Sequence, residues 1–457
     1  SLGLLGLARF QTRLLAQTTE AQSRVQASAL ADELLSTVLV DADGKLTRDL
    51  VPLWNDKRTI DLVRAFEQAN APASYLSESG NPPTPAWPGF KLAWMRDNDP
   101  DAYRRTAHVL MPKDYINLRL TGEIAVDEGD ASCSFLMNPQ TRSWSPAMVA
   151  RLGLDAAKLP PIRNPLDMLG VVTEAAALET GLRSGTPVLV GGADYPVALL
   201  GSGTCRPGLV SDVTGTSCIL TLIASHPLLD ADISNVATVE GNWGPFALLE
   251  SGGDAMRWSR RALHEGRESY EQLVARAAEA PVGSDGLFFL PFLTGERLGA
   301  HRNARAQFFG LGATHGLSHI NRAILEGVAF AGARHLKIME KASGQTIERV
   351  IASGGGAKTA LWLKIKASLY GVPIVVPEEQ ECGILGCAVM GAVATGQFST
   401  LDAAVTAIVR YTDEIQPDPA WQARYQRMQP IFDKLYFNSQ ALYDDLDALA
   451  ELSLPEE

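Results

Sequence analysis

Residues 349–377 read RVIASGGGAKTALWLKIKASLYGVPIVVP. The pattern predicts a strand at the start, a glycine loop at 354–357, a helix after the loop, and a second strand before Pro377. A strand, a helix and a second strand in this order are typical of a parallel crossover, in which the helix carries the chain between neighbouring parallel strands. This stretch therefore predicts an α/β protein that contains parallel strands.

The glycine loop of this crossover also has a functional interpretation. Three consecutive glycines cost considerable backbone entropy, so they indicate that another group approaches the loop closely. The residues fit neither GxxxxGK[ST] nor GxGxxG, and Lys358 stands in the wrong place for the lysine of a P-loop. A nucleotide site here would be of another kind, and a purely structural strand-to-helix turn remains the alternative.

Two further glycine-bearing turns lie upstream. Residues 209–223 predict two strands joined by a tight turn at 214–216, and the hydroxyl residues of the sequence SDVTGTS at 211–217 could donate several hydrogen bonds to one phosphate. Most such sequences are ordinary hairpin turns, so this interpretation is weak in isolation. The sequence SGGDAMRW at 251–258 predicts glycines that open a helix.

A single acidic residue follows a predicted strand at 187–191. The sequence GGADYP at 191–196 places Asp194 just after that strand, on a turn whose glycines allow another backbone or a ligand to approach. Carboxylates at strand ends of α/β proteins face the functional crevice, so Asp194 could accept the proton of a hydroxyl that attacks a phosphoryl group. A turn-forming Asp that bonds its own backbone is an equally weighted alternative.

Composition excludes several classes of protein. The 457 residues carry a formal net charge of −12 without a long Lys/Arg cluster, which argues against a nucleic-acid partner but leaves an anionic small molecule possible. The longest apolar run, 383–396, is too short to cross a bilayer, and the order of apolar and basic residues at the start does not fit a signal peptide. Five cysteines without a CxxC pair fit a reducing compartment, so we expect a cytoplasmic protein with no membrane partner.

The rest of the chain supports a two-domain division. We expect a short hairpin within residues 1–25, a strand at 36–43, helical structure at 91–120, a long helix at about 320–341 that ends at Gly344, and a helical tail over the last forty residues. Signals for βαβ units become frequent after about residue 188. The predicted domains are therefore 1–187 and 188–457.

Taken together and in order, nine segments resemble the FGGY family of carbohydrate kinases, with the xylulokinase group nearest in appearance. The resemblance extends from about residue 36 to about residue 430. Its segments are 54–58, 91–94, 112–115 with 120–123, 127–132, 191–203, 208–217, 290–292 with 295–297, 325–330, and 354–362 with 383–391.

The resemblance implies a fold, a reaction and a set of site residues. It implies an α/β fold of two actin-like (ribonuclease H-like) domains, each a mixed β-sheet flanked by helices, with a cleft between them; a small-molecule sugar binds mainly to the first domain, and ATP with Mg²⁺ mainly to the second. Asp194 would be the general base, and Tyr195 could touch the substrate. The expected nucleotide contacts are Gly215, Thr216 and Ser217 at the phosphates, Gly355, Gly356 and Ala357 at the adenosine, and Gly252 and Gly253 nearby. Asp56 and Arg58 would support the sugar side, no metal ligand is assigned, and a homodimer is possible.

The sequence also departs from the family pattern. The D-x-G-T phosphate loop and the S-G-Q-type sugar loop that the family carries near its start are not found here. Either stretches are missing from the sequence, with false junctions near Val25 to Ala27 and Leu35 to Ser36, or the protein is truncated and silent; the first is favoured, and the mass of the intact polypeptide distinguishes them. Residues 295–303 differ from the family loop, and Tyr195 replaces the Asn that is common in xylulokinases.

Three functions follow from these observations, in decreasing order of support. The first is ATP-dependent phosphorylation of a ketopentose such as xylulose, with a polyol such as erythritol or a sugar acid such as gluconate as alternative substrates. The second is a catalytically silent actin-like nucleotide-binding protein. A dinucleotide oxidoreductase is a poor third, because the glycine spacing does not fit.

Overall fold

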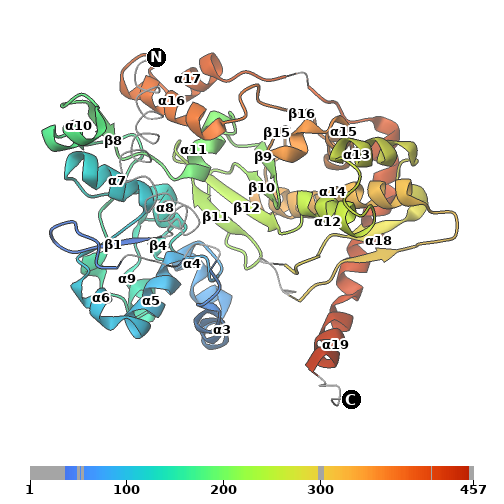
Figure 1. The fold of residues 1–457 in the computed structure, drawn as a ribbon, viewed down its shortest axis with the longest axis horizontal. Coiled ribbons are helices and arrows are strands. Elements are labelled where there is room, and N and C mark those ends of the chain that lie inside the picture. The colour runs from blue at the N-terminus through green and yellow to red at the C-terminus, as the bar shows by residue number, and fades with distance from the viewer. Residues whose placement is uncertain (1–36, 49–51, 53–55, 297–302, 413, 452–457) are drawn as a thin grey trace.

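The computed structural model describes residues 37–48, 52, 56–296, 303–412 and 414–451, and Figure 1 shows them as two lobes. The expected hairpin within residues 1–25, the two proposed junctions, Trp54 and most of the loop at 295–303 lie outside the described residues. The elements of the first lobe up to α11 are β1 (Val38–Val40), α3 (Ile60–Ala69), η1 (Pro72–Ser74), α4 (Leu76–Ser79), α5 (Pro88–Asn98), α6 (Pro100–Arg105), β2 (His108–Leu110), α7 (Pro112–Thr121), β3 (Val126–Asp127), α8 (Glu128–Ser132), β4 (Met137–Asn138), β5 (Ser143–Trp144), α9 (Pro146–Arg151), η2 (Ala156–Lys158), β6 (Ile162–Arg163), β7 (Met168–Val171), α10 (Glu174–Thr180), β8 (Pro187–Leu189) and α11 (Asp194–Gly201).

The remainder of the chain forms the central sheet, the second lobe and two helices that return to the first. Its elements are β9 (Leu209–Thr214), β10 (Cys218–Leu222), β11 (Ser234–Ala237), β12 (Trp243–Leu249), α12 (Gly253–Ala262), α13 (Tyr270–Glu279), η3 (Ser284–Gly286), β13 (Phe288–Leu290), β14 (Gln307–Phe309), α14 (Leu317–Ser343), β15 (Arg349–Ser353), η4 (Gly355–Lys358), α15 (Ala360–Tyr370), β16 (Ile374–Val375), α16 (Cys382–Ala394), α17 (Leu401–Ile408), α18 (Pro419–Asn438) and α19 (Gln440–Glu451).

A six-stranded mixed sheet, in the order β11-β12-β10-β9-β15-β16, organises the second half of the chain. The predicted parallel crossover is confirmed, because β15 pairs in parallel with both β16 and β9, and Val350 lies opposite Ile374 on one side and Val210 on the other. The predicted hairpin is also confirmed: β9 and β10 run antiparallel, with Thr214 opposite Cys218 around the turn. The α/β class is therefore as predicted.

The long helix α14 packs against this sheet. Its inward residues 321–334 are almost all buried, and Val328 and Phe330 belong to the core that also contains Val350 of β15. The helix begins three residues before the predicted start and ends two residues after the predicted end. Gly344 then closes it in the left-handed conformation, with φ of 66°, a backbone geometry that favours glycine. The predicted stop signal is confirmed.

The described strands of the first half form only two-stranded sheets: β1 with β2, β3 with β6, β4 with β5, and β7 with β8. Two predictions fail here. Residues 91–120 are not wholly helical, because β2 (His108–Leu110) separates α6 from α7 and pairs with β1, so that Val38 lies opposite Leu110. The predicted strand at 187–191 is shorter, because β8 ends at Leu189; Pro187 is exposed and the next two residues are half-buried, since β8 has a partner on one side only, whereas Val190 after the strand is buried.

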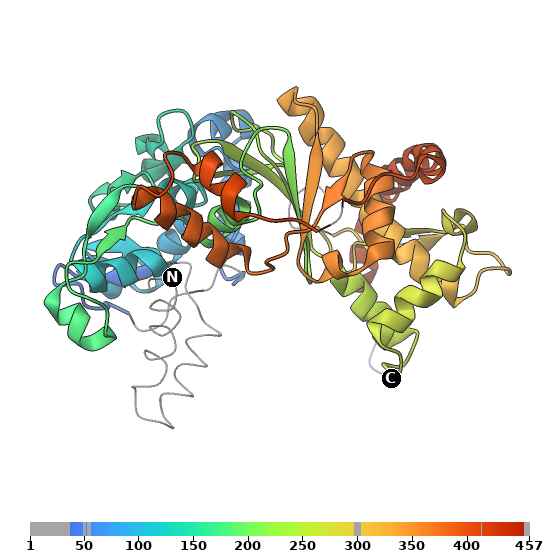
Figure 2. The same cartoon turned by 90° about the horizontal axis from the view of Figure 1, so that it is seen from above.

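Helices α16 and α17 return from the second half of the chain to the first lobe, where α16 packs along α11 (Figures 1 and 2). The contact is close because it is made at glycines. A Cβ atom on Gly201 of α11 would collide with the carbonyl oxygen of Cys382, and one on Gly386 of α16 would collide with that of Val197. Neither position accepts a side chain without a shift of the helices.

Two buried asparagines join the lobes at the edge of the central sheet. The Asn235 backbone N–H of β11 donates to Oδ1 of Asn81 at 2.7 Å, and Nδ2 of Asn81 donates to the Asn235 carbonyl at 3.0 Å. Nδ2 of Asn235 in turn donates to the Gly80 carbonyl at 2.7 Å. Because β11 is a terminal strand of the sheet, its outer edge has backbone groups without a neighbouring strand. The asparagine bonds satisfy the backbone groups of Asn235 at this edge.

The five cysteines are all free thiols; Cys205, Cys218 and Cys382 are buried, as expected of small apolar side chains. Within the part of the chain that the structure describes, no helix has the length and apolarity needed to cross a bilayer.

Candidate active site

The predicted phosphate turn and the predicted helix-opening glycines contact each other directly. The Gly253 backbone N–H donates to the Gly215 carbonyl at 2.8 Å, and that of Asp254 donates to the Thr216 carbonyl at 3.1 Å. A Cβ atom on Gly252 would lie 2.5 Å from the backbone of Ser217, which no side chain tolerates. The start of α12 therefore fixes the turn between β9 and β10 through its backbone.

The third glycine loop packs against the other side of the same turn. Gly354 has φ of 78°, and a Cβ atom there would lie 2.7 Å from the Thr214 carbonyl oxygen; one on Gly356 would lie 2.7 Å from the Thr214 side chain. Ala357 is buried, whereas a Cβ atom on Gly355 would meet no atom within 4 Å. Glycine is thus required at 354 and 356 for contact with the hairpin, while the open position at 355 leaves room for a ligand.

A buried ion pair supports both turns from below. Lys366 of α15 donates to both carboxylate oxygens of Asp212 on β9, at 2.9 and 2.7 Å, and to Oγ1 of Thr214 at 2.6 Å. The side chains are 3% and 0% exposed. The hydroxyl of Thr214 also donates to Asp212 at 2.6 Å. Sequence reasoning missed this pair, because a lysine in an amphipathic helix gives no signal that it points inward.

One cation lies beside the phosphate turn. Arg257 of α12 donates from Nη2 to Oγ1 of Thr216 at 3.3 Å and pairs with Asp254 at 3.0 Å, with more than half of its side chain exposed. An exposed guanidinium at this point can reach an anion held by the turn.

Asp194 is the first residue of α11, and its side chain is exposed. Its Oδ1 accepts a hydrogen bond from the Tyr195 backbone N–H at 2.6 Å, and a carboxylate in the first turn of a helix is favoured by the helix dipole. The loop before it is fixed by Asp127, whose Oδ2 accepts from the Ala193 backbone N–H at 3.3 Å. An exposed carboxylate on an anchored loop is suited to receiving a proton from a bound hydroxyl.

Tyr195 connects this helix to the central sheet. Its hydroxyl lies 2.5 Å from Oγ1 of Thr221 on β10, and its ring meets Phe246 of β12 edge-on. Burial raises the pKa of the Tyr195 hydroxyl well above its ordinary value. Among the described interactions, Asp194 itself does not touch the glycine turns; its neighbour Tyr195 makes the link to the hairpin that carries the phosphate turn.

An acidic cluster lies next to the Asp194 loop. Nζ of Lys113 lies 2.8 Å from Asp127 and 3.5 Å from Asp130, and it also pairs with Asp114. Burial alone would lower the pKa of Lys113, but the surrounding carboxylates outweigh it and raise that pKa. Burial raises the pKa of Asp114 to about 6 against the opposing effect of Lys113, and burial together with the charge of Asp127 raises that of Asp130 strongly.

The thiol of Cys133 is affected by the charges of both the acidic cluster and Asp194. Burial raises the pKa of the Cys133 thiol to about 12, and the carboxylates of Asp130, Asp127 and Asp194 contribute to the rise. The site therefore has more carboxylates than cations. Sequence reasoning quoted residues 127–132 as a family segment but assigned no role to Asp130.

The predicted supports on the sugar side pair with each other. The Arg58 guanidinium donates to Oδ2 of Asp56 at 2.9 and 2.6 Å and stacks over Trp94 at 5.0 Å. The Lys91 ammonium donates to the Asp56 carbonyl at 3.2 Å, and burial lowers the pKa of Lys91 to about 8. These contacts hold the start of α3 against α5.

No metal-binding group is evident where the structure can be described: no three or more His, Cys, Asp or Glu side chains are grouped so that they could hold a metal ion. No ligand for the expected Mg²⁺ is therefore assigned among the described residues.

Comparison with known proteins identifies relatives over almost the whole chain. The N-terminal domain model of the FGGY family of carbohydrate kinases matches residues 7–201, and its C-terminal domain model matches residues 211–395. The xylulose kinase of Bacillus subtilis (strain 168) is 27% identical over 410 residues, which span 89% of this chain and 81% of the relative. The autoinducer-2 kinase of Enterobacter sp. (strain 638) is 30% identical over 369 residues, which span 78% of this chain and 69% of the relative.

Among solved structures, the xylulose kinase from Rhodospirillum rubrum superimposes with a TM-score of 0.84 at 30% sequence identity. The match covers 89% of this chain and 83% of that one. The two-domain actin-like architecture expected from the sequence is thereby confirmed.

Proposed function

The chain belongs to the FGGY family of carbohydrate kinases, and from this premise we propose that it transfers the γ-phosphoryl group of ATP to a hydroxyl of a ketopentose such as xylulose. The observation that carries the proposal is the direct packing of the three glycine turns, with the Asp194 helix bonded to the same hairpin through Tyr195. The likeness to two xylulose kinases favours xylulose over other sugars.

In the proposed reaction, Asp194 accepts the proton of the attacking sugar hydroxyl. The sugar oxygen forms a bond to the γ-phosphorus while the bond to the β-phosphate oxygen breaks, and ADP leaves with that electron pair. Negative charge increases on the phosphate oxygens during the transfer. These oxygens accept hydrogen bonds from Gly215, Thr216 and Ser217, and from Arg257, which lies beside the turn. The adenosine binds at Gly355, Gly356 and Ala357. Gly252 and Gly253 lie behind the phosphate turn between β9 and β10. The proton then passes from Asp194 to water.

We expect Mg²⁺ to enter with ATP, since this ion is commonly held by substrate phosphates and retains several waters. The described residues offer no group of side chains that could hold this ion by themselves. A donor such as ATP also supports the expected location in the cytoplasm.

The exposed Asp194 beside the acidic cluster favours a neutral sugar over a sugar acid. Lys113 faces the acidic side chains of Asp114, Asp127 and Asp130, and the pKa values of Asp114 and Asp130 are raised, so the one cation is balanced within the cluster. Asp114 and Asp127 are buried, so a ligand would meet the exposed Asp194, which would repel the carboxylate of gluconate and can accept a hydrogen bond from a hydroxyl of xylulose or erythritol. Tyr195, although bonded to Thr221, stays a proposed substrate contact through its ring edge.

The decisive test is the Asp194→Asn variant in a coupled assay of ADP release. We expect loss of sugar-dependent turnover by about a thousandfold, because general-base catalysis contributes on the order of 10²–10⁴. Asp61→Asn is a matched control, since Asp61 is also an exposed Asp in the first turn of a helix, α3, and it should keep full activity. An Asp194→Asn variant that phosphorylates sugar at the normal rate would remove Asp194 from the mechanism.

The substrate is identified by running the wild-type protein against a panel of pentuloses, polyols and aldonates. The highest kcat/KM should fall on a ketopentose, and aldonates should rank last. Strong turnover of gluconate would contradict the charge argument, and ATP binding without ADP release on any member of the panel would favour a non-catalytic nucleotide-binding protein.

A further inference from the structure

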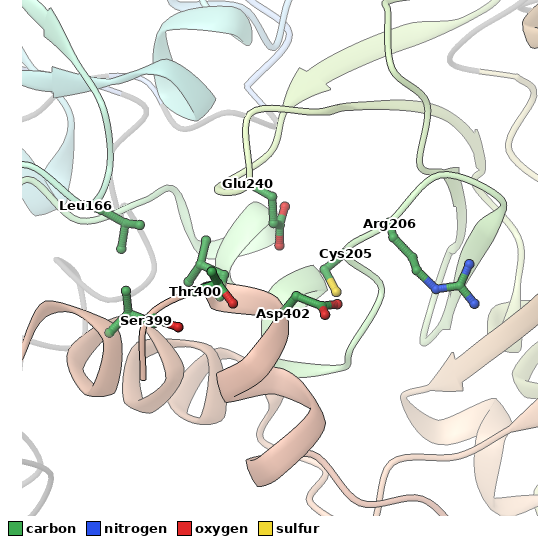
Figure 3. Close-up of a pocket in the computed structure, with 9 residues that line it drawn as sticks. Leu166, Cys205, Arg206, Glu240, Ser399, Thr400 and Asp402 are labelled. Atoms are coloured by element: carbon green, nitrogen blue, oxygen red, sulfur yellow. The ribbon is translucent and has the colours of Figure 1, made fainter. Parts of the chain in front are cut away.

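A pocket of about 380 Å³ opens at the end of α11 opposite to Asp194 (Figure 3). It lies between the loop after α11, the loop between β11 and β12, and the segment from the end of α16 to α17. Its volume is in the range of small-molecule sites. None of the residues that line it belongs to the proposed active site, so it is a separate feature of the molecule.

Glu240 points into this pocket from the loop between β11 and β12 (Figure 3). Its two carboxylate oxygens expose almost no surface, and neither has a well-aligned hydrogen-bond partner among the described residues, although the nearby Thr238 hydroxyl and the backbone N–H of Glu240 oppose the rise of its pKa. A buried carboxylate without a partner is costly, and burial raises the pKa of Glu240 to about 7. The unmet hydrogen-bonding capacity of this group indicates that something from outside the chain completes it.

The charges around Glu240 indicate which kind of ligand would pair with its carboxylate. Asp402, in the first turn of α17, adds a second carboxylate to the pocket. The nearby guanidinium of Arg206 turns away and pairs with Glu348 at 2.7 Å (Figure 3). Arg142 donates to the carbonyl of Gly241 next door but pairs with Glu128.

The remaining groups in the pocket do not supply a positive charge. The Cys205 thiol stays protonated, since burial and the charges of Glu240 and Asp402 raise its pKa to about 12. Leu166, Val393 and Leu401 form apolar walls. The described side chains do not group as metal ligands, so a compact metal ion fits the site poorly. Two carboxylates beside apolar walls match a cation with an aliphatic body.

We propose that this pocket binds a small aliphatic amine, with the ammonium group paired to the Glu240 carboxylate and a second donor directed at Asp402. The Glu240 side chain, whose oxygens are covered in this conformation, would turn toward the ammonium group on binding, and the carbon chain of the ligand would lie against the apolar walls. Binding of the amine would be independent of the kinase reaction, because the residues that line the pocket lie outside the proposed active site.

The probe for the test is 1,4-diaminobutane, titrated into the full chain by isothermal calorimetry at about pH 6, 7 and 8, with xylitol as an uncharged comparison. The diamine should bind, and its affinity should increase by about tenfold from pH 6 to pH 8 as Glu240 ionises. Glu240→Gln keeps the shape of the side chain and should weaken the diamine at least tenfold at pH 8. Asp402→Asn should weaken it by about threefold, and Glu279→Gln, an exposed site on α13, should not change it.

Three results would overturn the proposal. One is the absence of diamine binding at pH 8, and another is unchanged affinity in the Glu240→Gln variant. The third is binding of xylitol that weakens with rising pH, which would make protonated Glu240 a hydrogen-bond donor to a neutral ligand. If Glu240→Gln fails to fold, the proposal is still tested by the pH dependence of diamine affinity in the wild-type protein and by the diamine affinity of the Asp402→Asn variant.

Discussion

Lys366 and Asp212 form an ion pair with almost no exposure beneath the phosphate turn. Removing one partner of such a pair leaves an uncompensated buried charge, which costs about 3–5 kcal/mol. Lys366→Met should therefore lower the free energy of unfolding by about 3 kcal/mol or more, as measured by urea denaturation. Lys364→Met is the matched control on the same helix: the side chains of its pair with Asp418 are 43% and 27% exposed, so the pair reaches solvent and should be worth less than about 1 kcal/mol.

A loss of less than about 1 kcal/mol in Lys366→Met would mean that water reaches Asp212 in solution. Restoring stability with the double variant Asp212→Asn with Lys366→Met would show that the cost arises from the unpaired charge and not from lost packing.

Glu240 makes the stability of the protein depend on pH. Its pKa in the folded chain is about 7, above the ordinary value of 4.5. A carboxyl group whose pKa rises on folding binds its proton more tightly in the folded state, so its contribution to stability is complete below pH 4.5 and is lost as pH rises through 7. The loss is on the order of 3 kcal/mol. Urea unfolding from about pH 4.5 to 8 should show a fall in stability that is smaller by about this amount in Glu240→Gln, in which Asp114, whose pKa is also raised, still titrates; parallel curves would refute it.

Residues with a local signal were predicted, and residues whose role comes from tertiary contacts were not. The glycine runs at 214–217, 252–253 and 354–357 stand out in the sequence, because glycine has few reasons to cluster except close approach. Lys366, Asp130 and Glu240 carry no such signal. Each is a charged residue of a common type, and only the folded chain shows that its side chain points inward.

At the scale of elements, the packing of α11 on α16 depends on two glycines. Gly201→Ala would drive a methyl group into the carbonyl of Cys382 and push the helices apart, which we expect to cost about 1–3 kcal/mol in thermal or urea unfolding. Gly391→Ala is the control within α16, because a Cβ atom there meets nothing within 4 Å. It should stabilise the helix by up to about 1 kcal/mol. Equal changes in the free energy of unfolding for the two substitutions would contradict the close contact between α11 and α16.

Elements with strong patterns were predicted well. The hairpin β9–β10, the crossover β15–α15–β16 and the helix α14 each combine periodicity with a glycine at the turn or stop. Strand β2 was missed, because three residues between two helices gain their strand geometry from pairing with β1, and that pairing lies about 70 residues away in the sequence. Short strands fixed by distant partners are beyond local pattern reasoning.

At the scale of the whole molecule, the Asn81–Asn235 bridge ties the lobes together. Asn81→Ala would leave buried backbone groups of β11 without partners, at about 1–3 kcal/mol for each group. We expect calorimetry to show a lower Tm for this variant and a broadened or split transition, as the lobes lose part of their coupling. Asn98→Ala, an exposed position that bonds only its own helix, should behave like the wild type. A single, unshifted transition in Asn81→Ala would exclude coupling through this bridge.

The two-domain architecture followed from the resemblance of nine ordered segments and not from any single motif. The domain boundary at 187/188 and the homodimer stay predictions. Sedimentation velocity would measure the oligomeric state. The return of α16 to the first lobe was not expected, since nothing in its apolar sequence indicates which lobe it covers.

That return has a consequence for synthesis. Helix α11 ends at Gly201 and its packing partner α16 begins at Cys382, about 180 residues later. A ribosome that adds about 5–20 residues per second needs roughly 10–40 seconds to make the intervening chain. During that time the apolar side of α11 has emerged without the helix that covers it, so the nascent protein depends on chaperones or on provisional contacts until about the last sixth of the chain appears.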